Sequence, residues 1–410
     1  MRKLELLAPA GDMEKLKMAV LYGADAVYFG GEAFSLRSGA GNFSVPQIRE
    51  GVSYAHRFHV RCYLTLNIYA RNRDIEPIRS FLREIRDIPM DGFLVADPGV
   101  MELLKEEIPD AVIHLSTQAN LTNYEAARFW RKIGVKRLVL ARELTIEEIR
   151  GIRGHIPPDM ELECFVHGAM CISYSGRCLL SSFMTGRDSN QGMCAHPCRY
   201  HYALEEEKRP GQYVPIEEDE RGSYILNSKD LCMIRHIPEL ADAGVYSLKI
   251  EGRNKSIFYL ATVVHAYRQA LDAYLKDPEH WTFREEWFQE LEKASHREFY
   301  TGFYFGYEGA DAQNYKTSAY EKPYQFVGKV LAWNEKDNTA LIEERNKLVK
   351  GDEVEIFGPE ISYFMMTVDH IQDEETGEEI SEACHPKQKI RIPMPQSVKP
   401  GYLLRKKENH

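Results

Sequence analysis

The sequence predicts a (β/α)₈ barrel of the TIM type, followed by a small antiparallel β-barrel. From residue 4 to about residue 270, short β-rich apolar runs alternate with amphipathic helical patterns. Eight such apolar runs occur, which is the strand number of a closed parallel barrel. From about residue 322 the sequence pattern changes to short predicted strands separated by turns that carry Asn, Asp, Gly and Pro. These three observations set the predicted architecture.

The strand candidates span residues 4–7, 26–29, 61–68, 92–95, 112–116, 137–141, 162–166 and 246–250. Helical patterns such as MEKLKMAVLYG and TIEEIRGIR lie between most of them, often with Thr or Asp before the helix and Gly after it. A doubly wound open sheet is the alternative, but no GxGxxG motif follows the first strand to support it.

We predict a catalytic domain over residues 1–300, a linker over 301–321 and a C-terminal β-barrel domain over 322–410. The pattern VGKV…LVKGDEVEIFGP in the last part resembles the second domain of translation GTPases, which often packs against RNA. An insertion at 167–245 separates the seventh strand from the eighth and is longer than an ordinary loop. In a barrel it would lie at the carboxyl ends of the strands, where active sites are built.

Composition predicts a cytoplasmic protein with no membrane segment. No apolar stretch approaches the roughly 18 residues that a membrane helix needs, and the N-terminus does not resemble a signal peptide. The formal net charge of −10 describes the whole chain and leaves the local potential, and therefore the partner, open. Because the cytosol keeps thiols reduced, the eight cysteines indicate metal binding or redox chemistry rather than disulfides.

The inserted segment holds most of the cysteines: Cys171, Cys178, Cys194, Cys198 and, after a gap, Cys232. Thiolates suit iron–sulfur clusters or zinc. Zinc ribbons usually pair two CxxC knuckles, and the spacings here do not fit them, so an iron–sulfur cluster is favoured. We expect the remaining cysteines to be buried as small apolar side chains; they are Cys62, Cys164 and Cys384.

Polar residues follow the predicted strands and, in a barrel, would converge on one mouth; they are Asn67, Asp97, Ser116, Gln118, Asn120, Glu143, His167, Lys249, Glu251 and Arg253. Any one of them could equally be a cap or a turn residue. We interpret His167, Glu143 and Lys249 as candidate catalytic groups. Arginine forks bind carboxylate or phosphate groups. The candidate substrate-binding residues are Arg37, Asn67, Gln118, Asn120, Arg177, Glu251 and Arg253. Neither a HExxH helix nor a GxSxG elbow occurs.

The run ECFVHGAMC at 163–171, followed by GRCLLS at 176–181, resembles the signature of the collagenase-like peptidase family, number thirty-two among the unclassified peptidases. Further matching segments cover nearly the whole chain; they are LLAPAG, GADAVYFGG, FSLRSGAGNF, HLSTQANLTN, GMCAHPCRY, NSKDLCMI and SLKIEGRNKS. The sequence is most similar to the tRNA-modifying branch, whose members hydroxylate wobble uridine at carbon 5. Relatives hydroxylate a ribosomal cytidine or ubiquinone precursors.

The resemblance implies a 4Fe–4S cluster and oxygen-independent hydroxylation, with prephenate, a small carboxylate, as the hydroxyl source. It also implies that Cys171, Cys178 and Cys194 ligate the cluster, with Cys232 as the expected fourth ligand and Cys198 as its rival. The expected partner is the anticodon loop of tRNA, whose unpaired bases are accessible without opening a duplex. The resemblance is also compatible with a partner subunit of the same family.

Two other functions stay open at this point. The first is a peptidase, in which Cys171 or Cys178 with His167 would form a nucleophilic pair. A thiolate bound to a cluster would not be available for that role. The second is a non-catalytic RNA-binding or assembly factor whose cluster is a structural staple. The C-terminal barrel favours RNA over a quinone precursor as the substrate.

Overall fold

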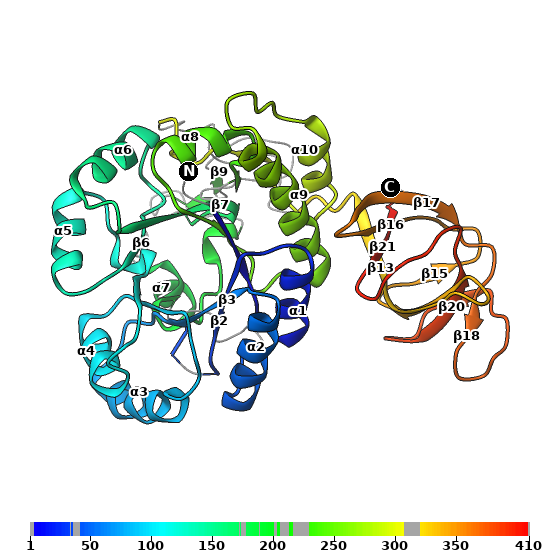
Figure 1. The fold of residues 1–410 in the computed structure, drawn as a ribbon, viewed down its shortest axis with the longest axis horizontal. Coiled ribbons are helices and arrows are strands. Elements are labelled where there is room, and N and C mark those ends of the chain that lie inside the picture. Colours follow the sequence, from blue (N-terminus) through cyan, green and yellow to red (C-terminus); the bar gives the residue numbers. More distant parts are fainter. Residues whose placement is uncertain are drawn as a thin grey trace.

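The computed structural model describes residues 4–32, 34–35, 42–171, 173, 178–187, 189–200, 203–205, 213–215, 229–306 and 320–408. A closed parallel barrel forms the larger part, and an antiparallel β-structure lies beside it (Figure 1). Among the described residues, none of the helices combines the length and the apolar character needed to span a membrane.

Eight parallel strands form the barrel: β1 (Glu5–Pro9), β2 (Ala26–Gly30), β3 (Arg61–Leu66), β4 (Gly92–Val95), β5 (Ile113–Leu115), β6 (Arg137–Val139), β7 (Glu161–Ala169) and β11 (Ser247–Ile250). Each pairs with the next in the chain, and β11 pairs with both β7 and β1, which closes the sheet. The predicted barrel is therefore confirmed, and the open doubly wound alternative is excluded.

Helices surround this barrel: α1 (Met13–Leu21), α2 (Val45–Arg57), α3 (Asn72–Ile85), α4 (Pro98–Glu107), α5 (Tyr124–Lys132), α6 (Ile146–His155), α8 (Ile237–Asp242), α9 (Ile257–Lys276) and α10 (Glu285–Glu292). Their starts follow from side-chain caps, which satisfy backbone N–H groups of the first turn. Asp12 caps α1, Ser256 caps α9, and Thr145 forms a capping box with Glu148 at α6.

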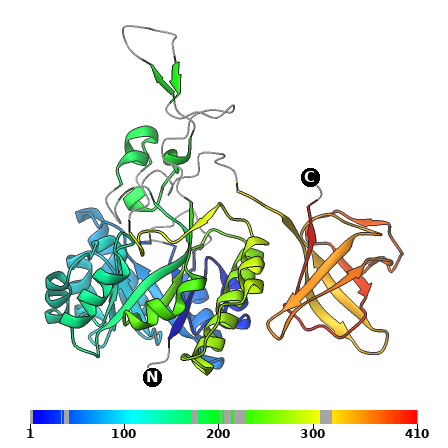
Figure 2. The same cartoon turned by 90° about the horizontal axis from the view of Figure 1, so that it is seen from above.

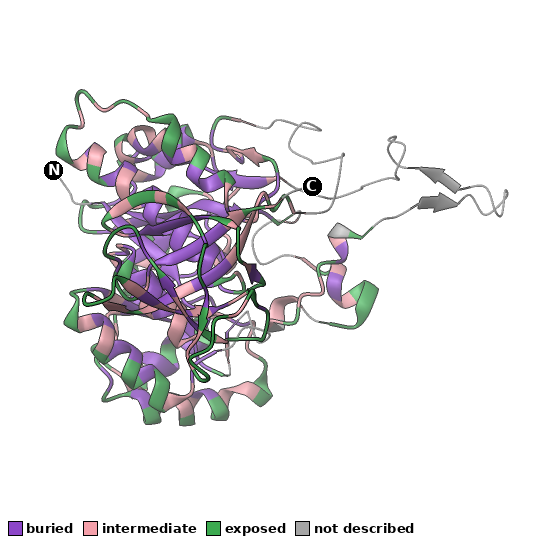
Figure 3. Cartoon of the chain, turned by 90° about the vertical axis from the view of Figure 1, so that its right-hand side faces the viewer, coloured by how far each residue is buried: buried purple, intermediate pink, exposed green. Residues whose placement is uncertain are grey.

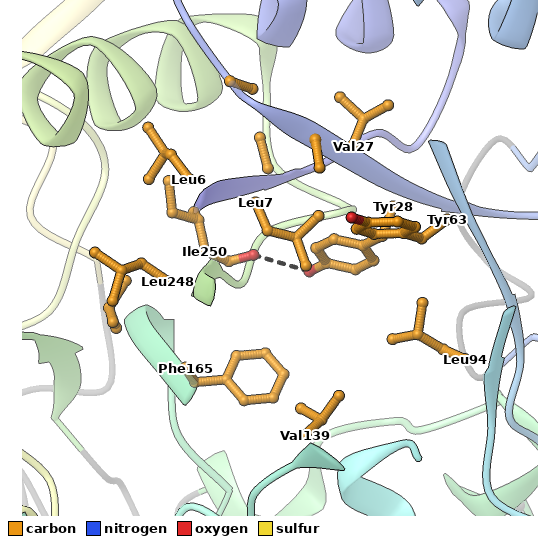
Figure 4. Close-up of a cluster of buried hydrophobic side chains, with 14 of the residues drawn as sticks. Leu6, Leu7, Val27, Tyr28, Tyr63, Leu94, Val139, Phe165, Leu248 and Ile250 are labelled. Carbon is orange, nitrogen blue, oxygen red and sulfur yellow. Dashed lines mark hydrogen bonds between the residues drawn. The ribbon is translucent and has the colours of Figure 1, made fainter. Parts of the chain in front are cut away.

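The core fills the barrel and the layer between strands and helices (Figure 3). The five residues of β1 and of β2 are all buried, as expected for strands covered on both faces. Inside the barrel, apolar side chains from several strands face one another, among them Leu7, Tyr28 and Phe165 (Figure 4). The Tyr28 hydroxyl donates to the carbonyl oxygen of Ile250 at 2.9 Å, which ties β2 to the end of β11.

The segment between β7 and β11 begins at the carboxyl end of β7 and projects from the barrel end opposite the start of β1 (Figure 2). It contains α7 (Leu180–Thr185), η2 (Ser189–Gln191), η3 (Pro197–Arg199), β8 (Ala203–Glu205), β9 (Tyr213–Pro215) and η4 (Ile234–His236). β10 (Asp230–Cys232) returns antiparallel to β7, and β12 (Phe299–Tyr300) pairs with β10. Two strands therefore extend the barrel sheet, which the sequence did not indicate.

The C-terminal part is an antiparallel sheet of seven strands in the order β17-β16-β21-β13-β14-β20-β18. Its strands are β13 (Tyr324–Asn334), β14 (Thr339–Glu344), β16 (Glu353–Gly358), β17 (Ile361–Thr367), β18 (Gln372–Asp373), β20 (Lys389–Pro393) and β21 (Leu403–Lys407), with a separate pair, β15 (Leu348–Val349) and β19 (Glu382–Ala383). The sheet curls around its own apolar core (Figure 2). The antiparallel prediction is confirmed. In the described part of the chain, no pairing joins β17 to β18 to close the sheet into a barrel.

A buried charge cluster joins the two parts. Arg405 of β21 is fully buried and donates to Glu290 of α10 and, at 2.8 Å, to Glu355 of β16. Beside it, Tyr22, the residue after α1, donates to the carbonyl oxygen of Gly401 at 3.1 Å. Such paired and hydrogen-bonded burial fixes the orientation of the C-terminal part against α1, α9 and α10.

Candidate active site at the carboxyl ends of the barrel strands

Arg253, three residues past the end of β11, links three strand ends at the mouth. Its guanidinium donates to Thr65 at 3.1 Å, to Ser35 at 3.0 Å and to Asn42 at 2.8 Å. The Arg253 side chain is buried, and it packs directly against Gly30. A Cβ atom at position 30 would lie only 3.0 Å from Arg253 Nη2. Arg253 thus fixes the segment after β2 and the end of β3 relative to β11.

A second set of contacts joins the ends of β3 and β5. Asn67 donates to the hydroxyl of Ser116 at 3.2 Å, and Tyr69 donates to the carbonyl oxygen of Gln118 at 3.1 Å. Ser116 also caps η1 (Thr117–Ala119), which places Gln118 on the first turn after β5. The structure therefore joins the segments that follow β3 and β5, which carry Asn67 and Gln118, while the substrate-binding roles of these two residues stay predictions.

Other predicted mouth residues have separate placements. Asp97 caps α4 through the backbone N–H of Val100 at 3.0 Å, so its role is structural. Glu251 accepts a hydrogen bond from Tyr28 at 3.3 Å. Asn120 ends η1 in the left-handed region, at φ 52°. The substrate-binding and catalytic roles of these residues, and of the half-buried Glu143, remain predictions.

The sequence predicts Lys249 among the residues that follow the strands. In the structure it lies within β11, with its side chain in the barrel interior. Its Nζ donates to Glu163 at 2.7 Å, and Glu163 also accepts from Arg137 at 3.0 Å. Arg137 donates in turn to Glu5, at 2.6 Å. Burial alone would raise the pKa of Glu5, but the charges of Arg137 and Arg61 outweigh it and hold this pKa below its ordinary value. The network is a buried ion cluster beneath the mouth, and Glu161 completes it by pairing with Arg137 at 2.7 Å.

His167 likewise lies inside its strand, β7, and is almost completely buried. Its ring packs against Tyr267 of α9, at 5.5 Å between ring centroids, and against Phe299 of β12, at 5.4 Å. Burial lowers the pKa of His167 to about 3, so the imidazole is neutral. Its acid–base role stays a prediction that no contact among the described residues supports.

Two cysteines of the insertion lie side by side. The thiols of Cys171 and Cys178 share a hydrogen bond, which lowers the pKa of Cys178 to about 5 and raises the pKa of Cys171. Arg142 adds a positive charge near Cys171. A thiol and a thiolate held together in this way match the chemistry of two adjacent ligands to a soft metal.

The third expected ligand, Cys194, is half-buried in the same segment. The hydroxyl of Ser181 in α7 accepts a hydrogen bond from the backbone N–H of Ala195 at 3.0 Å, which ties the Cys194 loop to α7. Cys198 lies on η3, which packs against α7. Cys194 and Cys198 therefore belong to the same small unit as Cys178, which lies just before the start of α7.

Cys232 has a different setting. It lies in β10 opposite His167 and is buried, with the Tyr267 hydroxyl 4.0 Å from its sulfur. Burial raises the pKa of Cys232 to about 11. In the described part of the chain, no three Cys, His, Asp or Glu side chains form a group that could hold a metal ion. The structure thus gathers the Cys171–Cys178 pair and leaves the fourth position of the predicted cluster open between Cys232 and Cys198.

The three remaining cysteines differ in their burial. Cys62 and Cys164 are buried, as predicted, whereas Cys384 is exposed, and the expectation for it is wrong. Cys384 follows the short edge strand β19, where the small second core does not reach it. Arg37 and Arg177 lie outside the described residues.

Sequence reasoning missed Thr65, Ser35, Asn42 and Tyr28, which contact Arg253 or Glu251. Ser35 and Asn42 belong to the segment FSLRSGAGNF, and that segment was the available signal. Thr65 and Tyr28 gave no signal because they lie within apolar strand runs.

A closed parallel barrel with polar strand ends and a thiol-bearing insertion above them is the architecture of a barrel enzyme, with its active site at the carboxyl ends of the strands. The chain belongs to peptidase family U32, as the resemblance predicted. The family model matches residues 11–314, and the model of the family's C-terminal domain matches residues 322–405.

Named relatives align along nearly the entire chain. The "tRNA hydroxylation protein P1" of Bacillus subtilis (strain 168) is 43% identical over 99% of this chain and 95% of its own length. The "tRNA hydroxylation protein P" of Escherichia coli (strain K12) is 35% identical over 98% of this chain and 96% of its own. A "Collagenase" of Porphyromonas gingivalis (strain ATCC BAA-308 / W83) is 32% identical over 98% of this chain and 97% of its own.

Proposed function

We propose that this protein is a tRNA hydroxylase that forms 5-hydroxyuridine at the wobble position. The observation that carries the proposal is the 43% identity, over 99% of the chain, to a protein named for tRNA hydroxylation. The mouth is compatible with a base as substrate, because Asn67 and Gln118 lie on the segments after β3 and β5 and their amide groups are of the type that pairs with the edge of a uracil ring. Since tRNA is a cytoplasmic molecule, the proposal includes a cytoplasmic location.

The proposal includes a 4Fe–4S cluster held by Cys171, Cys178, Cys194 and a fourth cysteine, Cys232 or its rival Cys198. The Cys171–Cys178 pair fits two adjacent ligands, and the lowered pKa of Cys178 supplies a thiolate at neutral pH. When bound, such a cluster supplies redox or Lewis-acid chemistry beside the mouth. The chain's own residues bind and orient the reactants: Arg253 fixes the strand-end segments, and the amides of Asn67 and Gln118 meet the base.

Prephenate is the proposed hydroxyl donor. In a hydroxyl exchange, the donor's C–O bond breaks, a C–O bond forms at carbon 5 of uridine, and the hydrogen from carbon 5 ends on the donor. Atoms and electrons then balance without an external oxidant. Arg37, Arg177 and Arg142 are the proposed carboxylate partners; of these, only Arg142 lies among the described residues, where it donates to the carbonyl oxygen of Ala169 at 3.3 Å, at the carboxyl end of β7.

Mass spectrometry of tRNA nucleosides from a strain that lacks the gene tests this function. We expect 5-hydroxyuridine derivatives to disappear and to return with a plasmid copy of the gene. Unchanged levels in a strain without a second family member would refute the tRNA assignment.

A peptidase is the second candidate, because one relative is named a collagenase. A cysteine peptidase needs a histidine within reach of its thiol. Here the ring of His167 packs between Tyr267 of α9 and Phe299 of β12, and across the strand pair it lies opposite Cys232. We therefore expect no collagen cleavage by anaerobically purified protein. Cleavage that persists with a metal chelator and disappears in Cys171→Ala would favour the peptidase.

A further inference from the structure

The inserted segment beside the mouth exposes apolar side chains to an extent found nowhere else in the described barrel part. Phe183 of α7 is 86% exposed and Leu179 is 70% exposed. Met184, Met193 and Tyr200 of the same segment are each between 44% and 47% exposed. Large exposed apolar side chains that gather in one segment indicate a binding surface, whereas single ones elsewhere need no explanation.

The backbone attaches this segment to the mouth. Ser189 and Asn190 donate to the carbonyl oxygen of Cys178, at 2.9 and 3.1 Å, which folds η2 back onto the start of α7. The carbonyl oxygen of Asn190 accepts from the backbone N–H of Tyr69 at 3.2 Å, and the Tyr69 hydroxyl reaches Gln118. The exposed side chains therefore belong to a unit that is bonded to the segments after β3 and β5.

The sequence of the part that carries these side chains has no excess of acidic residues. Residues 178–200 contain two arginines, Arg187 and Arg199, and one carboxylate, Asp188, whereas the chain has a net charge of −10. A stretch without net negative charge does not repel a polyanion, and the exposed rings of Phe183 and Tyr200 can stack on its unpaired bases.

We propose that the exposed face formed by Leu179, Phe183, Met184, Met193 and Tyr200, which lie on α7 or in the segment around α7 and η3, is a stacking platform for unpaired bases of the substrate RNA. The inference rests on the proposed function and assigns an RNA-binding role to residues outside the mouth. Aromatic side chains stack on any base, so the platform adds affinity for a single-stranded loop with little sequence preference. The mouth then selects the base that is modified.

The test is binding of an anticodon stem-loop RNA to the full-length, cluster-loaded protein, measured by fluorescence anisotropy at one fixed salt concentration. We expect Phe183→Ala to weaken binding about tenfold, and Phe183→Trp to restore it, because one stacked base contributes roughly a factor of ten or more. Phe129→Ala is the matched control, since Phe129 is an exposed ring on α5, 55% exposed, away from the insertion. Iron content is measured for each variant to show that the cluster unit is intact.

A fully paired RNA of the same length provides the second comparison, and its affinity should not change with Phe183→Ala. Equal stem-loop affinity in the wild type, Phe183→Ala and the double variant Phe183→Ala/Tyr200→Ala would overturn the platform, even if the wild type hydroxylates tRNA. A change in oligomeric state with unchanged RNA affinity would also overturn it, since the face would then be a protein interface. A wild type that neither binds nor hydroxylates tRNA would refute the proposed function itself, and the platform with it.

Discussion

Lys249 and Glu163 form an ion pair of 2.7 Å inside the barrel, with both side chains almost fully removed from solvent. Glu163 also compensates Arg137 at 3.0 Å, so one carboxylate serves two buried cations. The Lys249 that the sequence suggested as catalytic is, in its contacts, a member of this interior cluster.

Glu163→Ala should therefore destabilise the fold by about 3–5 kcal/mol, because removal of one partner leaves buried charges uncompensated. Urea unfolding measures the change. The control is Lys105→Ala, which breaks an exposed pair with Glu102 at 2.7 Å and should cost about 0–1 kcal/mol. Equal, small effects of the two substitutions would show that the interior pair contributes no net stability.

The buried His114 of β5 should make stability depend on pH. Burial, together with the charge of Arg137, holds the pKa of His114 well below its ordinary value of 6.5. Below pH 6.5 the unfolded chain therefore binds a proton that the folded chain does not, so stability falls as pH falls. His114→Gln should reduce the slope of the unfolding free energy against pH, by about 1.4 kcal/mol per pH unit between pH 6.5 and 5. An unchanged slope would contradict this account.

The stability of the fold should depend on the forked guanidinium of Arg253, and not only on its positive charge. Arg253→Lys replaces two donating nitrogens by one, so it cannot keep the bonds to Thr65, Ser35 and Asn42 together. We expect a lower melting temperature and a loss of about 1.5–3 kcal/mol, the value of a hydrogen bond to a charged group. The exposed Arg49, paired with Asp87, is the control, and Arg49→Lys should leave the melting temperature unchanged.

The junction between the two parts of the chain should depend on Arg405. This side chain is fully buried between Glu290 of the barrel part and Glu355 of the C-terminal sheet. Arg405→Ala leaves two carboxylates without their partner, and we expect a loss of about 3–5 kcal/mol. Limited proteolysis should then cut between residues 301 and 323 in the variant faster than in the wild type. Equal cleavage rates would mean that other contacts hold the two parts together.

The barrel could be predicted from the sequence because its eight strands are short and mostly apolar, and such runs mark strands that are covered on both faces. Two strands that extend the sheet, β10 and β12, were missed. They are two or three residues long, and the pairing of β10 with β7 and of β12 with β10 depends on tertiary contacts rather than on a local pattern.

The candidate site was predictable only in part. The segments that carry Asn67 and Gln118 are joined by Ser116 and Tyr69, because parallel strands end at one edge. His167 was misplaced because a polar residue at the end of an apolar run was interpreted as following the strand, whereas β7 continues through it. Lys249 was counted with the mouth residues although it lies within the predicted strand, and in β11 it pairs with Glu163 in the interior. Cys384 was expected to be buried from its residue type alone, and burial depends on the position of the core.

The central claim is tRNA hydroxylation by a site that includes the Cys171–Cys178 pair. The most direct measurement is the 5-hydroxyuridine content of tRNA, by mass spectrometry of nucleosides, in a deletion strain that carries wild-type, Cys171→Ser or Cys178→Ser protein at equal amounts. We predict full restoration by the wild type and none by either variant, with loss of bound iron from both purified variants. Restoration of the modified nucleoside by Cys171→Ser and Cys178→Ser to the wild-type level would contradict the account.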